Sequence, residues 1–230
     1  MRRILATLFF SFTFLSNPLF AEDLSLSDIE KYAAEGDASA QFKLAMMYNN
    51  GTGVVLDNKQ AHSWYTKAAE QGHADAQYNL GLNYAVGAGV PQDYKQAHNW
   101  FIKAAEQGNS AAKDALGDMY RFGKGVRQDY KQAHNWFIKA AEQGNTNAQN
   151  SLGFMYSKGQ GVRQDDQQAL NWYTKAAEQG NALSQSTLGI MYIYGAGVRQ
   201  NTAIAKEWFG KACDNGDQGS CDRYRELNTQ

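Results

Sequence analysis

Proline and cysteine are scarce in this chain, with two residues of each among 230, and its 22 basic and 23 acidic residues nearly cancel. Collagen-like, proline-rich and charge-driven disordered chains have different compositions, so these classes are excluded. The net charge of −1 leaves no excess of positive charge to hold a phosphate backbone. We therefore expect no nucleic-acid partner.

Long hydrophobic runs are also absent after the N-terminal segment. In that segment two arginines precede the apolar run 4–15, and Ala21 stands before two acidic residues. This order is typical of a secretory signal peptide, and the run is shorter than the roughly 18 residues that span a bilayer. The pattern predicts a signal peptide over residues 1–21, Sec-dependent export, and a periplasmic or secreted chain that does not insert into a membrane.

Glycine is abundant, and many of the 22 glycines keep a fixed spacing. The five tryptophans are separated by the same 36 residues, and a set of six glycines keeps this interval. The tryptophans are Trp64, Trp100, Trp136, Trp172 and Trp208, and the glycines are Gly36, Gly72, Gly108, Gly144, Gly180 and Gly216. A fixed period of this length is the signature of a repeat array. It predicts five repeats, over 37–72, 73–108, 109–144, 145–180 and 181–216, between an N-terminal half repeat (22–36) and a C-terminal half repeat or cap (217–230).

The pattern within each repeat predicts two helices. In the second repeat Ala76, Leu80 and Tyr84 lie four apart and form one helical stripe. A second stripe over 94–107 holds Trp100 and several alanines at spacings of three and four, and a glycine follows it where helices often end. A Gly-x-Gly-Val loop joins the two stripes in every repeat. Each repeat is therefore predicted to be an antiparallel helix pair.

One helix pair is too small to bury its own apolar face. We expect the tryptophans and the alanine-rich ridges to pack on the next pair, because alanine lets helices approach closely. The predicted fold is all-α, a right-handed α-solenoid whose stability grows with the contacts between neighbouring repeats. We expect the chain to be monomeric.

The residues of one repeat resemble known repeat families. Gln77-x-x-Leu80-Gly81-x-x-Tyr84, followed by Ala97-x-x-x-Phe101-x-x-Ala104, resembles the tetratricopeptide pattern. The inserted Gly-x-Gly-Val loop, the tryptophan and the closing Lys-Ala-Ala-Glu-Gln-Gly make the chain resemble the Sel1-like repeats of bacterial exported proteins. This resemblance implies a non-enzymatic protein–protein interaction scaffold, in the cell envelope or secreted, in some cases at the interface with a host.

Comparison of the five copies points to a binding face. In the first helix of each repeat some positions change little, whereas others on one helical face vary freely, and many of the variable residues are large and apolar. By resemblance to tetratricopeptide arrays, these positions line the concave groove and bind a partner protein or peptide. The candidate partner-binding residues are Phe42, Met46, Tyr78, Leu82, Asp114, Asp118, Arg121, Phe122, Phe154, Ile190, Ile193 and Tyr194. We expect these side chains to lie outside the core between repeats.

The two cysteines, Cys213 and Cys221, lie eight residues apart on either side of the Gly216 turn. Antiparallel helices joined by a tight turn can bring two such side chains within bonding distance, and export favours a disulfide. The spacing also resembles that of the cysteine-rich Sel1-like proteins of Helicobacter, which implies a bridge between the two helices of a repeat. A catalytic thiol pair is the alternative, although redox pairs are usually spaced Cys-x-x-Cys.

Three patterns have an enzymatic or metal-binding alternative. The Gly-x-Gly loop follows a helix rather than a strand and lacks the third glycine of a nucleotide-binding loop. His62, His98 and His134 occupy one repeat position, and neighbouring repeats lie at least ~8–10 Å apart, too far for ligands of one zinc ion. Ser110 and Lys113 form one Ser-x-x-Lys match, which chance alone explains. We expect no cofactor, no metal site and no catalytic residue. Weak β-lactam binding or hydrolysis, which the cysteine-rich relatives imply, is the alternative function.

Overall fold

The computed structural model describes residues 24–229, which fold into helices joined by short loops, with no strand among them. The helices of this range are α1 (Leu26–Ala34), α2 (Ala38–Asn50), α3 (Asn58–Glu70), α4 (Ala74–Val86), α5 (Tyr94–Glu106), α6 (Ser110–Phe122), α7 (Tyr130–Ala141), α8 (Thr146–Lys158), α9 (Asp166–Glu178), α10 (Ala182–Tyr194), α11 (Thr202–Asp214) and α12 (Gln218–Asn228). The expected signal peptide lies outside the described residues. Between residues 24 and 229 no helix is long and apolar enough to cross a membrane. The all-α solenoid predicted from the sequence is confirmed.

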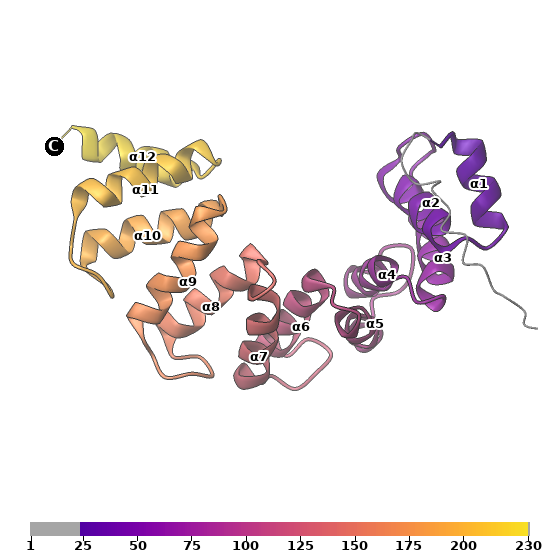
Figure 1. Ribbon diagram of the computed structural model, residues 1–230, viewed down its shortest axis with the longest axis horizontal. Helices are drawn as coiled ribbons and strands as arrows, with labels where there is room; N and C mark the ends of the chain where they lie inside the picture. Colours follow the sequence, from indigo (N-terminus) through magenta and orange to yellow (C-terminus); the bar gives the residue numbers. More distant parts are fainter. Residues whose placement is uncertain (1–23, 230) are drawn as a thin grey trace, which may run out of the picture.

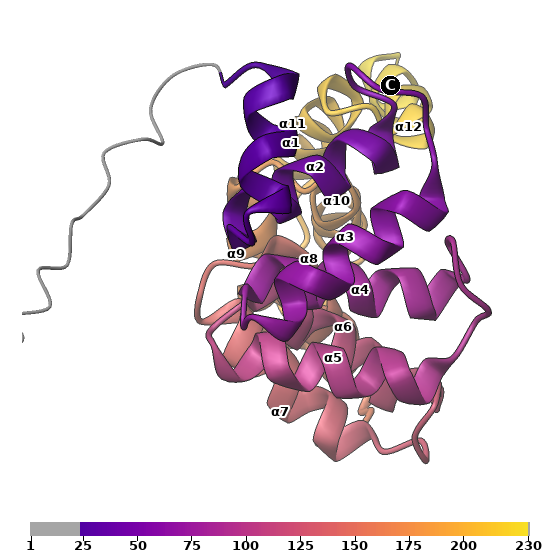
Figure 2. The same cartoon turned by 90° about the vertical axis from the view of Figure 1, so that its right-hand side faces the viewer.

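The repeats form five antiparallel pairs, each made of an A helix and a B helix. The A helices are α2, α4, α6, α8 and α10, and the B helices are α3, α5, α7, α9 and α11. Figure 1 shows the pairs arranged as an arch, with α1 at one end, α12 at the other, α4 and α6 on the inner side, and α5 and α7 on the outer side. In the side view of Figure 2, the helices α3, α4, α5 and α7 run roughly parallel to one another, one below the next, and loops lie at their ends. The A helices of the middle repeats therefore carry the concave surface.

The Gly-x-Gly-Val loops end one helix and position the next. Gly123 ends α6 in the left-handed conformation, with φ of 68°. A Cβ on Gly125 would meet the carbonyl oxygen of Tyr94 at 2.6 Å, so this loop packs directly on the preceding B helix. Asp129 Oδ1 then accepts hydrogen bonds from two backbone N–H groups in the first turn of α7, at 2.9 and 3.0 Å. Both glycines of the loop are therefore structural.

The apolar core runs along the joints between repeats. One buried cluster joins Phe101 of α5 to Ala112 and Leu116 of α6, and similar clusters join α3 to α4 and α7 to α8. Each cluster thus combines the B helix of one repeat with the A helix of the next. A single pair does not bury its own apolar face, so each repeat depends on its neighbours for stability.

The tryptophans differ from the sequence prediction in direction and in depth. Trp136 of α7 packs on the cluster at the joint between α5 and α6, rather than on the cluster that α7 forms with α8. The ammonium of Lys139 lies 4.3 Å from the Trp136 ring centroid, and the other four tryptophans carry a lysine in the same way. Trp136 is half-buried, whereas its neighbour Phe137 is fully buried. Phe137 and its equivalents are therefore the central aromatic residues of the core.

Glycine in the A helix makes room for that aromatic ring. A Cβ on Gly117 would lie 2.5 Å from the Phe137 ring, and Gly81, Gly153 and Gly189 stand similarly close to the aromatic residue of their own B helix. Two carbon atoms do not approach so closely without repulsion. The ring therefore lies directly against the backbone of the A helix, and the glycine sets the distance between the two helices of a pair.

Side-chain amides link consecutive repeats. Gln149 Nε2 donates to the carbonyl oxygen of Ala141 at 3.2 Å, and Gln179 Nε2 donates to Gln149 Oε1 at 2.8 Å. The same chain of hydrogen bonds recurs in three other repeats. In the third repeat Lys113 replaces the glutamine and donates from Nζ to Gln143 Oε1 at 2.8 Å. These bonds satisfy buried polar groups, so they fix the register of one repeat against the next.

A disulfide closes the C-terminal end of the array. Cys213 of α11 and Cys221 of α12 are bonded, with their Cα atoms 4.6 Å apart. The pair expected from the sequence is therefore at bonding distance. Since α12 packs on α11, the bond holds the half repeat to the fifth helix pair.

We predict that Gly117→Ala destabilises the protein, although alanine favours a helix over glycine by about 1 kcal/mol. The added methyl group must displace Phe137 or separate α6 from α7, and such overpacking typically costs about 1–3 kcal/mol. Denaturant unfolding measures the change. Gly219→Ala is the matched control in α12, because its Cβ would lie 3.7 Å from the nearest atom, and it should be neutral or stabilising. Equal effects of the two substitutions would contradict the packing argument.

We predict that the disulfide stabilises chiefly the end of the array. Replacing both cysteines by serine should lower the free energy of unfolding by roughly 2–3 kcal/mol, the loop-closure value for a short loop. Because a terminal helix has few neighbours, amide hydrogen exchange should quicken over 205–229 before it quickens elsewhere. A uniform rise in exchange along the chain would show that the bond acts on the whole array instead.

Candidate partner-binding groove

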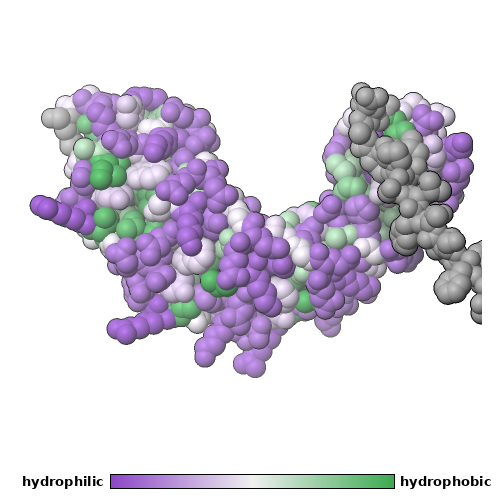
Figure 3. Space-filling model, in the orientation of Figure 1, coloured by the Kyte–Doolittle hydropathy of each residue, from purple (hydrophilic) through white to green (hydrophobic). Residues whose placement is uncertain are grey.

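The twelve candidate residues all lie on A helices, but their surroundings differ along the array. Those near the N-terminus contact the core, those in the middle include a charged group, and those toward the C-terminus line two cavities. Figure 3 shows a largely hydrophilic outer surface on the arch, with smaller hydrophobic groups among it. The groove is therefore not uniform, and each part is described in turn.

At the N-terminal end most candidate side chains belong to the core. Phe42 packs on the first buried cluster, and Tyr78 and Leu82 pack on the second. The Tyr78 ring lies 5.8 Å from the ring of Phe101, the central aromatic residue of its own repeat. The expectation that Phe42, Tyr78 and Leu82 lie outside the core is therefore wrong in part, because all three are partly buried and pack against it. Met46 is the exception and is 41% exposed.

The middle of the groove carries three charged residues of α6. The Arg121 guanidinium donates to Asp118 at 2.8 Å, and its carbon lies 4.5 Å from the centroid of the Phe122 ring. Asp114 lies one helical turn before Asp118 and forms no ion pair within residues 24–229. Arg121 thus lies near two carboxylates, and Lys124 also acts on that of Asp118.

The surroundings of Asp114 disfavour its charged form. Burial, together with the neighbouring carboxylate of Asp118, raises the pKa of Asp114 to about 7, and Arg121 opposes the rise. Burial raises the pKa of Asp118 as well, against the effect of the same arginine. Burial and the charge of Asp114 raise the pKa of Tyr78. An ionisable group whose charge is disfavoured in this way is more often found at functional sites than elsewhere.

The first cavity, here called the central cavity, has a volume of about 550 Å³. It is lined by Arg121, Phe122, Gln128, Tyr130, Asn150, Ser151, Phe154, Gln160, Tyr173, Leu183 and Thr187. Phe122, Phe154 and Leu183 come from three consecutive A helices and are 56%, 37% and 63% exposed. Exposed apolar groups gathered around one hollow are typical of an interaction site.

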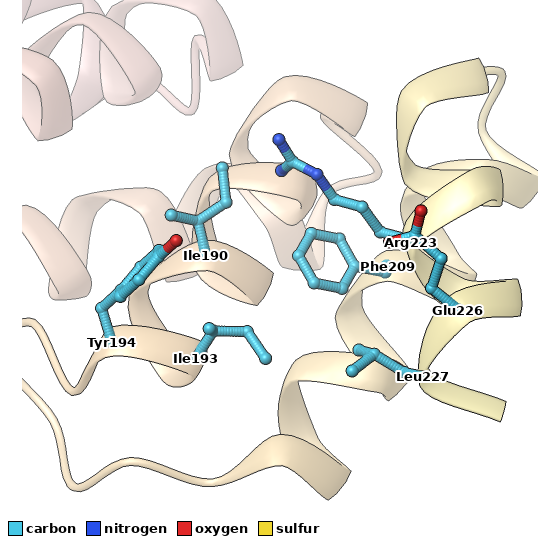
Figure 4. Close-up of a pocket in the computed structure, with 7 residues that line it drawn as sticks. All are labelled: Ile190, Ile193, Tyr194, Phe209, Arg223, Glu226 and Leu227. Carbon is cyan, nitrogen blue, oxygen red and sulfur yellow. The ribbon is translucent and has the colours of Figure 1, made fainter. Parts of the chain in front are cut away.

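The second cavity, here called the C-terminal cavity, has a volume of about 280 Å³. It is lined by Ile190, Ile193, Tyr194, Phe209, Arg223, Glu226 and Leu227. Figure 4 shows the side chains of α10 facing Phe209 and the residues of α12, with Arg223 extending across Phe209 toward Ile190. The Arg223 guanidinium carbon lies 5.4 Å from the Phe209 ring centroid. The cavity thus has apolar walls and one charge of each sign, Arg223 and Glu226.

Side-chain size at one repeat position explains where the cavities open. The position reads Phe42, Tyr78, Asp114, Asn150 and Ser186 along the chain. The two aromatic residues cover the central aromatic ring of their own repeats. Asn150 and Ser186 are too small to do so, and Tyr173 and Phe209, the corresponding rings, line the two cavities. Both cavities therefore open where this position carries a small side chain.

Sequence comparison missed several lining residues for identifiable reasons. Gln160 lies in a loop, and Arg223 and Leu227 lie in the half repeat, which has no complete copy to compare with. Leu183 lies about two helical turns before Ile190, on the same face of α10 but near the start of the helix, before the candidates that this helix contributes. The five repeats have Ser39, Asp75, Ala111, Asn147 and Leu183 at this position. Leu183 is the one large apolar residue among small or polar ones, and this difference could have identified it as a lining residue.

The three histidines and the Ser110/Lys113 pair are absent from the described lining of both cavities. His62, His98 and His134 each meet a tyrosine of the following A helix edge-on, with ring centroids 5.2 to 5.7 Å apart, and burial lowers the pKa of all three. Among residues 24–229 no three possible metal ligands lie together. The Lys113 ammonium donates to Gln143 rather than to Ser110.

We predict that Asp114→Asn stabilises the protein at pH 8 but not at pH 4. The folded protein holds the Asp114 proton up to about pH 7, whereas the ordinary value is 3.8, so the wild type loses stability as the pH rises between these values. The variant avoids this loss and should gain roughly 1–2 kcal/mol at pH 8. Denaturant unfolding over this pH range measures the difference. Asp166→Asn, at an exposed site of α9, controls for net charge, and a gain that does not change with pH would contradict the assignment.

The sequence pattern of the Sel1 repeat matches five consecutive segments, residues 38–73, 74–109, 110–145, 146–181 and 182–217. A protective antigen present in uropathogenic Escherichia coli strains is 42% identical, with a TM-score of 0.84 over 89% of this chain and 44% of that one. The present chain thus spans less than half of that protein's length. No curated protein sequence matches the chain.

Two further solved structures are similar. A Sel1 repeat protein from Oxalobacter formigenes is 34% identical, with a TM-score of 0.78 over 83% of this chain and 76% of that one. A Sel1 repeat protein from Klebsiella pneumoniae is 24% identical, covers 88% and 98% of the two chains, and shares the fold with a TM-score of 0.56. Since the repeat pattern covers residues 38–217 without interruption, the chain belongs to the Sel1 repeat family.

Proposed function

We propose that this protein is an exported, non-enzymatic scaffold that binds a segment of a partner protein in its concave groove. The observation that carries the proposal is the gathering of exposed apolar side chains around two adjoining cavities. Such groups on one surface indicate an area that a partner covers. The A helices that hold them rest on buried clusters, so the side chains are preorganised for binding.

The composition of the cavities favours binding over catalysis. The described lining of the central cavity includes no histidine, cysteine, lysine or carboxylate, so no strong general base faces the hollow. The C-terminal cavity holds Glu226 and Arg223 among apolar walls and has no serine, cysteine or histidine in its described lining. Apolar walls with a few polar groups suit recognition of a side chain and a main chain.

Two features support a place outside the cytoplasm. The disulfide between Cys213 and Cys221 is typical of oxidising compartments. The N-terminal segment has the order of a secretory signal peptide. The 42% identical E. coli protein is described as a protective antigen, which agrees with exposure beyond the cytoplasm. We therefore place the mature chain in the periplasm or outside the cell.

The proposal predicts that two exposed aromatic residues are needed for partner capture. Phe122 and Tyr194 stand at the same repeat position, where the first repeat has Asn50, so Phe122→Asn with Tyr194→Asn copies a residue the fold already accepts. Crosslinking in the native envelope fraction, read by mass spectrometry, identifies the partners of the wild type. The double variant should bind the purified partner at least about tenfold more weakly, because buried aromatic anchors dominate such interfaces.

Val86→Asn is the matched control for this experiment. Val86 occupies the same repeat position and is exposed, but it lines neither cavity. The control should bind the partner as the wild type does, and thermal melts should show all variants folded. Equal binding by the wild type and the double variant would place the interaction elsewhere on the molecule and reject the proposal.

A further inference from the structure

The two cavities share one wall, the helix α10. Leu183 and Thr187 of this helix line the central cavity, and Ile190, Ile193 and Tyr194 line the C-terminal cavity. Leu183 and Tyr194 are 63% and 80% exposed, so α10 carries one exposed apolar side chain beside each cavity. A single ligand that lies across this helix can reach both hollows.

The cavities are also built alike. Phe154 and Ile190 are 36 residues apart, as are Tyr173 and Phe209, and each of these residues lines its own cavity. Each hollow therefore has the central aromatic ring of a B helix as its floor and an apolar residue of the A helix as its wall. Because the two cavities have the same kind of floor and wall, both suit an apolar side chain of a ligand.

The polar groups around the hollows favour a neutral main chain. In the central cavity they include three amides, Gln128, Asn150 and Gln160, beside the hydroxyl groups of Tyr130, Ser151, Tyr173 and Thr187. Gln160 Oε1 has no hydrogen-bond partner among the described residues. The one cation of that lining, Arg121, is paired with Asp118. The lining of the C-terminal cavity holds one positive and one negative side chain, Arg223 and Glu226. This balance disfavours an anionic polymer or a strongly basic segment, whereas peptide groups can pair with amides in either direction.

Resting on the function proposed above, we infer that the occupant is one extended segment of a partner polypeptide that crosses α10 and places one apolar side chain in each cavity. An extended segment leaves its main-chain groups free to pair with the amides, whereas a helix satisfies its own. Packed helices lie ~8–10 Å apart and an extended chain rises about 3.3 Å per residue, so the two anchors are at least about three residues apart.

The chain itself supplies variants that block one cavity at a time. Asn150→Tyr copies Tyr78 and should cover Tyr173, which closes the central cavity. Ser186→Phe copies Phe42 and should cover Phe209, which closes the C-terminal cavity. Both replacements use side chains that this repeat position already holds in a folded repeat. Thermal melts confirm folding before any binding is measured.

The probe is a peptide selected from a displayed library of random 15-residue sequences on the full mature chain, then synthesised and titrated by calorimetry. We expect the selected sequences to share two apolar residues at least about three positions apart. Replacing either anchor by alanine should weaken binding about tenfold or more, and so should each blocking variant. A shortened peptide with the first anchor alone should respond to one blocking variant, and a peptide with the second anchor alone should respond to the other.

The outcomes separate this inference from the proposed function. If one blocking variant abolishes binding and the other leaves it unchanged, the ligand occupies a single cavity, and the inference is wrong while the proposed function stands. If shortened peptides with either anchor respond to the same variant, the crossing of α10 is likewise rejected. If no peptide is enriched over the double blocking variant Asn150→Tyr with Ser186→Phe, the groove does not bind polypeptide, and the proposed function fails with the inference.

Discussion

The contact between an aromatic ring of the B helix and a glycine of the A helix determines the rest of this structure. Because Gly117 has no side chain, the Phe137 ring lies against the backbone of α6, and the same contact recurs in the repeats of Gly81, Gly153 and Gly189. The ring also belongs to the buried cluster that α7 forms with α8. One residue thus fixes both the distance within a pair and the joint to the next pair, which is how a chain without a central core becomes a rigid array.

One face of each A helix does not form the joint between repeats, and its side chains differ along the array. Phe42 and Tyr78 fold back on the aromatic rings of their own repeats and add to the core. Asn150 and Ser186, at the same position, leave the rings beneath them uncovered, and the cavities open there. Asp114 occupies this position in the middle repeat, where burial disfavours the carboxylate form and raises its pKa. A binding surface thus arises from smaller side chains on a constant scaffold.

The sequence was sufficient for the helix pairs, their period and the C-terminal disulfide. The 36-residue spacing predicted the helix pairs and the array, and the Cys213 and Cys221 spacing predicted the bonded pair, because these depend on local periodicity and short loops. The burial of individual side chains depends on the packing between repeats, and the sequence did not predict it. Trp136 and Phe137 are adjacent, and only packing shows that the second is the buried one. Likewise the variable positions were recognised, but whether a side chain there is exposed depends on its size against the ring below.

The contrast between the two halves also bears on how such a groove acquires a ligand without losing stability. A large-to-small change at the position of Asn150 removes a contact at the surface of the core, while the ring of Tyr173 still fills the interior. The loss of stability is therefore smaller than for a substitution that opens a cavity within the core. Exposed residues such as Phe122 and Tyr194 can then change with little effect on the joints, since they contribute to the rim rather than to the buried clusters. The central ring thus holds the repeats together and also forms the floor of a cavity, whereas the residues on the rim can change and alter specificity while the scaffold keeps its shape.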